Sequence, residues 1–135
     1  MPTRSGYTRA AMAVLRDIMT EDVLAVAPED TLGEVAAKMV ERGVGSVVVG
    51  DFGRIIGVLT ERDIMRAVAA RTHSSDARVR EWMTSDPITA TADTDVEDAG
   101  RTMLENGFRH LPVVDGEQAV GIVSIRDVVA WELQR

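Results

Sequence analysis

The stretch that decides the fold is present twice in the chain. Residues 57–63 read Gly-Val-Leu-Thr-Glu-Arg-Asp, and residues 121–127 read Gly-Ile-Val-Ser-Ile-Arg-Asp. Both fit one pattern, in which a glycine and two apolar residues precede a hydroxyl residue, one unmatched residue and an Arg-Asp pair. Between residues 16 and 63, twelve positions carry the same residue 64 places later, without a gap. The chain therefore contains two copies of one supersecondary unit.

Each copy carries the same order of local signals. In the first, apolar residues fall at helical spacing after a capping box at Thr31 and Glu34 and before a glycine stop at Gly43, which predicts a helix over residues 31–42. Apolar runs separated by turn residues predict strands on either side. The predicted unit is β-α-β-β-α, with extended segments at 23–26 and 88–90, helices around 31–42 and 96–104, strands at 47–49, 55–59, 111–114 and 119–123, and final helices beginning near Thr60 and at Ser124.

The two copies divide the chain into four segments. A polar stretch at residues 71–78 is typical of a linker, so we expect an N-terminal arm at 1–13, one repeat at 14–70 and a second at 79–135. A three-stranded sheet with helices on one face leaves apolar surface uncovered in each repeat, so the two should pack together with pseudo-two-fold symmetry. We expect a mixed α/β (α+β) fold with its ligand cleft between the repeats.

Composition argues against several classes of protein. The 135 residues carry a formal net charge of -7 and no cysteine. Binding of duplex nucleic acid usually requires a basic face, so nucleic acid is not an expected partner. No apolar run approaches the roughly 18 residues that a membrane span requires, and the arm lacks the apolar core of a secretory signal. We expect a cytoplasmic protein with no disulfide and no membrane attachment.

The repeated motif permits two interpretations. Thr60 and Ser124 can act as helix N-caps, with Asp63 and Asp127 as their reciprocal capping partners. Alternatively, the free N–H groups, the hydroxyl and the arginine at such a helix start suit a phosphate, and the carboxylate suits the two hydroxyls of a ribose. The glycine that opens each motif would then let the backbone approach a ligand closely. The motif alone leaves capping and nucleotide binding open as equal alternatives.

The duplication, the size of the unit and the motif together resemble a pair of CBS domains, named after cystathionine β-synthase, an arrangement also called a Bateman module. The resemblance covers about residues 14–132. In that family the Asp of the motif typically binds ribose, the hydroxyl and nearby positions reach phosphate, and the first short strand flanks the adenine. The resemblance implies these nucleotide-binding residues: Asp63, Thr60, Arg62 and Gly57 in the first copy, Asp127, Ser124, Arg126 and Gly121 in the second, and Val23, Leu24, Pro87 and Ile88 around the base.

Residues 107–113, Gly-Phe-Arg-His-Leu-Pro-Val, resemble the segment that leads into the family's second strand, where basic residues often face ligand phosphates. Arg109 and His110 are therefore further candidate ligand residues. The matching residues 43–46 of the first copy carry no charge, so we expect the two clefts to differ in phosphate affinity. Because His110 has no second ligand at metal spacing, we expect no metal site and no required cofactor.

The leading interpretation is a stand-alone regulatory CBS pair that binds an AMP-like nucleotide and signals to an effector protein in trans. ADP, ATP, NAD(H) and S-adenosylmethionine are also compatible with a ribose-binding Asp. The alternative is a dimerisation or interaction scaffold without a ligand, in which both motifs only cap helices. An enzyme is not expected, because two histidines and no cysteine leave little material for an activated nucleophile or an acid–base pair. The resemblance also implies a homodimer, formed through the helices that follow Thr60 and Ser124.

Overall fold

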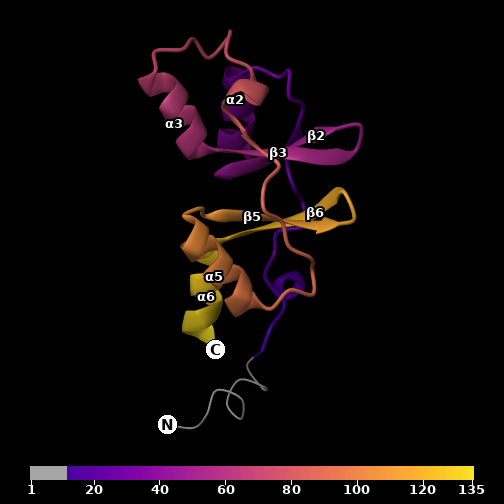
Figure 1. Ribbon diagram of the computed structural model, residues 1–135. Coiled ribbons are helices and arrows are strands. Elements are labelled where there is room, and N and C mark those ends of the chain that lie inside the picture. The colour runs from indigo at the N-terminus through magenta and orange to yellow at the C-terminus, as the bar shows by residue number, and fades with distance from the viewer. Residues whose placement is uncertain (1–11) are drawn as a thin grey trace.

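The structure, a computed structural model, describes residues 12–135, so most of the expected N-terminal arm lies outside the described residues. Two halves are stacked, with a sheet from each half towards the centre of the molecule and helices on the outside (Figure 1). The elements are the 3-10 helix η1 (Leu15–Asp17), strands β1 (Ala25–Val26), β2 (Ser46–Asp51), β3 (Arg54–Thr60), β4 (Thr84–Ser85), β5 (His110–Asp115) and β6 (Gln118–Ser124), and helices α2 (Leu32–Arg42), α3 (Glu61–Ala69), α4 (Val79–Trp82), α5 (Val96–Asn106) and α6 (Ile125–Gln134).

Helix α2 forms where the apolar spacing predicts it. The Glu34 backbone N–H donates to the Thr31 hydroxyl oxygen at 3.2 Å, and the Thr31 backbone N–H donates to the Glu34 carboxylate at 3.4 Å. The helix ends at Gly43, whose φ of 66° lies in the left-handed region that glycine adopts readily. Both predicted ends of this helix are confirmed.

Each half contains one strand position more than the three expected. The first sheet has the order β1-β2-β3-β4, with β1 parallel to β2 and the other neighbours antiparallel. The second half repeats this arrangement in shorter form. Strands β5 and β6 pair antiparallel, Ala90 makes a single parallel bridge to Val113, and Thr20 makes a single antiparallel bridge to Ile122. The additional position is filled in each half by the leading segment of the other repeat, at Thr84–Ser85 in the first half and at Thr20 in the second.

The extended segment predicted at 88–90 is reduced to one bridge because of Pro112. In the first half, the Val48 backbone N–H donates to the Leu24 carbonyl at 3.0 Å. The matching position 64 residues later is Pro112, which has no N–H to donate. The Ala90 N–H still donates to the Pro112 carbonyl at 3.0 Å. The segment at 88–90 therefore still runs beside β5, but with fewer backbone hydrogen bonds than β1 makes to β2.

The packing exchanges segments between the repeats. Ala77 and Val79, at the end of the linker and the start of the second repeat, are buried in the core of the first half. Leu15, which precedes the first repeat's own strands, is buried in the core of the second half. Each half of the fold is therefore built from two separate stretches of chain.

The halves meet through their hairpins. The Ile55 backbone N–H donates to the Glu117 carbonyl at 2.9 Å, and the Arg54 guanidinium pairs with the Glu117 carboxylate at 3.0 Å. These contacts join the β2–β3 hairpin to the β5–β6 hairpin (Figure 1). Two clefts are lined by residues of both halves.

Candidate ligand-binding clefts

The two clefts are related by the repeat. Each combines the motif of one repeat with the leading segment of the other. Their volumes are about 410 Å³ for the first cleft and about 850 Å³ for the second. Both lie in the range of roughly 300–1,000 Å³ that small-molecule sites occupy.

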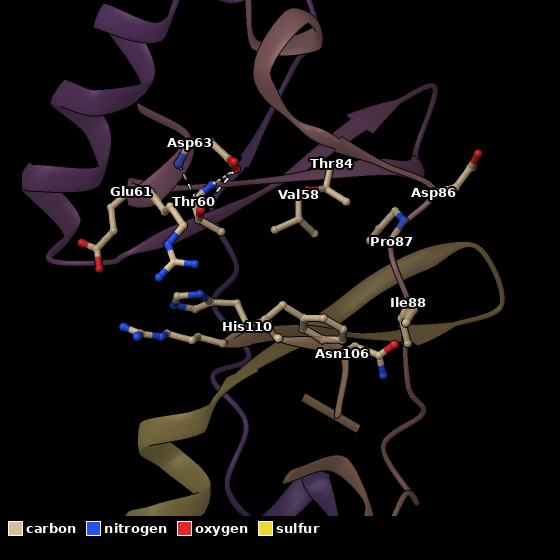
Figure 2. Close-up of a pocket in the computed structure, with 14 residues that line it drawn as sticks. Val58, Thr60, Glu61, Asp63, Thr84, Asp86, Pro87, Ile88, Asn106 and His110 are labelled. Carbon is tan, nitrogen blue, oxygen red and sulfur yellow. Dashed lines mark hydrogen bonds between the residues drawn. The ribbon is translucent and has the colours of Figure 1, made fainter. Parts of the chain in front are cut away.

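The first cleft is formed around the motif of the first repeat. Thr60, Arg62 and Asp63 line it together with Pro87 and Ile88 from the segment leading into the second repeat. Figure 2 shows Thr60 and Asp63 on its upper side and Pro87 and Ile88 closing its right-hand end. Polar groups at a helix start thus lie opposite apolar groups of the other repeat.

Asp63 is held within a helix cap and is only 6% exposed. Its Oδ2 accepts hydrogen bonds from the Thr60 backbone N–H at 2.9 Å and from the Thr60 hydroxyl at 3.2 Å. Its Oδ1 accepts a bond from the Arg66 guanidinium at 3.0 Å, and that guanidinium lies 5.8 Å from the centre of the Trp82 ring. The capping interpretation is therefore realised here. It does not exclude ligand binding, because a carboxylate offers about four acceptor positions.

Asp127, in the second cleft, has fewer partners. Its Oδ2 accepts a bond from the Ser124 backbone N–H at 2.8 Å, and its own N–H donates to the Ser124 hydroxyl oxygen at 3.1 Å. The position matching Arg66 is Ala130, so the helix offers no arginine to its Oδ1. Val23, Leu24 and Arg126 are further predicted residues that line this cleft.

Arg109 and His110 line both clefts. Figure 2 shows the His110 ring within the first cleft, below Thr60. Burial lowers the pKa of His110 from its ordinary value of 6.5 and the charge of Arg109 acts in the same direction, whereas the carboxylates of Glu61 and Asp127 oppose the shift. The ring is therefore mostly neutral at pH 7, with one nitrogen as donor and the other as acceptor.

Twelve of the fourteen predicted ligand residues line a cleft, and the exceptions are Gly57 and Gly121. A Cβ built on Gly57 would lie 2.6 Å from the Met83 sulfur, and one built on Gly121 would lie 2.6 Å from the Met19 sulfur. Their expected role, close approach of the backbone to a ligand, stays a prediction. In the structure the crossing chain segment packs closely against each glycine, and neither glycine lines either of the two clefts.

Sequence reasoning did not include several residues that also line the first cleft. Glu61 occupies the unmatched position of the motif, Asp86 precedes Pro87, and Phe108 precedes Arg109. Each is therefore a chain neighbour of a predicted residue, and that adjacency was the available signal. No comparable signal in the sequence indicates that each motif lies beside the leading segment of the other repeat. That arrangement depends on how the chain crosses from one half to the other.

Within residues 12–135, no group of three or more His, Cys, Asp or Glu side chains is arranged to hold a metal ion. Over the same stretch, no helix has both the length and the apolar character needed to cross a bilayer.

Comparisons with known proteins identify both repeats. The family model for the CBS domain matches residues 15–70 and 79–133. An uncharacterized 17.7 kDa protein of Acidianus ambivalens is 45% identical over 113 residues, which cover 82% of this chain and 68% of that protein. The CBS domain-containing protein YhcV of Bacillus subtilis is 33% identical over 122 residues, which cover 90% of this chain and 87% of that protein.

A solved structure shares the fold. The crystal structure of the CBS domain pair of protein MJ0100, in complex with 5'-methylthioadenosine and S-adenosyl-L-methionine, has a TM-score of 0.81 at 25% identity. The similarity covers 88% of this chain and 94% of that one. Because the family model matches two successive stretches that together span most of the sequence, this chain belongs to the CBS domain family, as a tandem CBS pair.

Proposed function

We propose that this protein is a stand-alone regulatory CBS pair that binds an adenosine-containing ligand between its repeats and catalyses no reaction. The observation that carries the proposal is the make-up of the first cleft. There the buried carboxylate of Asp63 lies opposite Pro87 and Ile88, with Arg109 and His110 along the same cavity. In this proposal the ribose meets the carboxylate, the base meets the apolar groups, and a phosphate meets the Arg109 guanidinium and the N–H of the His110 ring.

A related structure supports the chemical class of the ligand. The CBS pair of MJ0100, which has a similar fold, holds 5'-methylthioadenosine and S-adenosyl-L-methionine. Both compounds contain an adenosine unit. An AMP-like nucleotide is our first choice for this chain, because Arg62 and Arg109 supply donors for a phosphate. ADP, ATP, NAD(H) and S-adenosylmethionine share the same ribose and remain in the proposal.

Binding in the first cleft would use an oxygen that already has a partner. Asp63 Oδ1 accepts a bond from Arg66, whose side chain is 61% exposed. A ribose hydroxyl would share this oxygen with Arg66 or replace it. Because the ligand would touch both halves at once, it would favour one relative placement of the repeats, and an effector protein in trans would read that placement.

The test is a calorimetric titration of the full chain with AMP, ADP, ATP, NADH and S-adenosylmethionine, on the wild type and on Asp63→Asn and Asp127→Asn. We expect binding that falls at least about tenfold in one of the two variants, which identifies the working cleft. Glu34→Gln is the matched control, because Glu34 closes the same kind of capping box on α2 and lines neither cleft. Absence of binding for every adenosine ligand, or an equal loss in Glu34→Gln, would refute the proposal.

One observation favours the scaffold as a second candidate function. The caps at Thr60 and Ser124 are both complete without a ligand, so helix capping alone accounts for the two motif aspartates. The scaffold predicts that Asp63→Asn and Asp127→Asn lower stability by the cost of a lost cap, about 0.5–2 kcal/mol, while no adenosine ligand binds to any form.

We also propose that two copies of the chain associate. Exposed apolar side chains gather on the helices that follow the two motifs. On α3 these are Met65 and Val68, which are 64% and 65% exposed, and on α6 they are Val129 and Leu133, which are 49% and 80% exposed. Burying these side chains against a second copy would remove apolar surface from water.

A further inference from the structure

Three side chains form a wall that the two clefts share. Glu61, Arg109 and His110 line both cavities. Around them the repeat is symmetric: the Glu61 N–H donates to the Gly45 carbonyl, and the Ile125 N–H donates to the Arg109 carbonyl, each at 2.9 Å. Ligands in the two clefts would therefore contact the same side chains.

The basic part of this wall has no second copy. The residues that match Arg109 and His110, 64 positions earlier, are Gly45 and Ser46, and neither carries a charge. Both line the second cleft, where they contribute no cation. One guanidinium and one imidazole therefore serve two ligand positions.

The other charges in the clefts make this sharing important. Each cleft has two arginines and three carboxylates, and Arg109 and Glu61 are common to both. A cleft that cannot use Arg109 keeps one arginine against three carboxylates, which is an unfavourable setting for a phosphate. The remaining members are Arg62, Asp63 and Asp86 in the first cleft and Arg126, Asp22 and Asp127 in the second.

We propose that Arg109, with His110 beside it, is a phosphate-binding group shared by the two clefts, so that the chain holds one phosphorylated adenosine ligand at a time. This inference rests on the proposed function and adds its stoichiometry. A planar guanidinium pairs in bidentate fashion with one phosphate. A second phosphate, in the other cleft, would lie across the same wall from the first. Arg109 would already be paired with the first phosphate. An adenosine ligand without a phosphate does not need Arg109, so such a ligand can occupy both clefts at once.

Calorimetric titrations with adenosine and with AMP test this stoichiometry. We expect the wild type to bind two equivalents of adenosine but one of AMP, with any second AMP at least about tenfold weaker. We expect Arg109→Gln to lower the ratio of AMP affinity to adenosine affinity at the stronger site by at least about tenfold.

A gain-of-function variant sharpens the test. Gly45→Arg supplies the missing counterpart of Arg109, and the three atoms nearest to a Cβ at this position all belong to the Glu61 carboxyl group, at 3.3–3.5 Å. We expect this variant to bind two AMP molecules with affinities within about threefold of each other. Gly50→Arg adds the same charge at a residue that lines neither cleft, and we expect it to keep the wild-type stoichiometry.

The outcomes separate this inference from the proposed function. Two AMP molecules bound equally by the wild type overturn the shared group and leave nucleotide binding in place. One equivalent of adenosine and one of AMP also overturn it, because the phosphate then does not set the number bound. If neither compound binds, the proposed function fails and this inference fails with it.

Discussion

At the scale of single residues, His110 ties stability to pH. Its pKa in the folded protein lies below 6.5 because burial penalises the charged ring, even though Glu61 and Asp127 oppose the shift. The unfolded chain therefore binds a proton more readily, and the free energy of unfolding should fall as the pH drops below about 6.5, by about 1.4 kcal/mol for each unit between the two pKa values. Between about pH 7.5 and about pH 5.5, we expect the free energy of unfolding to fall less in His110→Gln than in the wild type, because the variant lacks this ring. Urea unfolding at the two pH values measures the difference. His73→Gln, at an exposed residue of the linker, should show the same fall as the wild type, and identical profiles for His110→Gln and the wild type would contradict this assignment.

At the scale of elements, the contact between β3 and β4 depends on a missing side chain. A Cβ at Gly57 would lie 2.6 Å from the Met83 sulfur and 2.9 Å from the Thr84 carbonyl oxygen, and the latter is backbone that cannot move aside alone. We expect Gly57→Ala to lower the free energy of unfolding by about 1–3 kcal/mol, as overpacking usually does. Gly50→Ala is the matched control on β2, because its Cβ would meet only the Arg54 carbonyl oxygen at 3.5 Å. Urea unfolding of both variants measures the difference, and equal effects would show that the crossing does not require glycine.

At the scale of the whole molecule, the exposed apolar faces of α3 and α6 predict self-association. We expect the wild type to sediment with twice the mass of the chain, and Met65→Glu combined with Leu133→Glu to sediment as a single chain, because a buried carboxylate without a partner is strongly disfavoured. Phe52→Glu is the control, since Phe52 is 98% exposed at a hairpin turn away from both helices. A wild type that sediments as one chain, or a Phe52→Glu variant that dissociates as the helix variant does, would exclude this interface.

The predictable features were local ones, and the unpredicted ones depended on distant pairing. The capping box at Thr31 and the stop at Gly43 follow from side chains within one turn, so the sequence alone places both ends of α2. Strand β4 consists only of Thr84–Ser85, which is too short to show an alternation of apolar and polar residues. It is held by backbone pairing with β3, so no local pattern in the sequence predicts it. The family resemblance supplied twelve of the residues that line the clefts. It did not indicate that Arg109 lines both of them, since that requires the relative placement of the two halves.

The exchange of segments also bears on how such a chain can diverge. Each half completes its sheet with the stretch that leads into the other copy, so two separate identical copies would have to supply that stretch to each other. In a pair of identical chains, every substitution would enter both clefts together, and an arginine in one would be an arginine in the other. Joining the copies in one polypeptide removes that constraint. The contrast between Gly45 and Arg109 is a difference that a fused chain can inherit and a pair of identical chains cannot, because each copy in the fused chain mutates on its own.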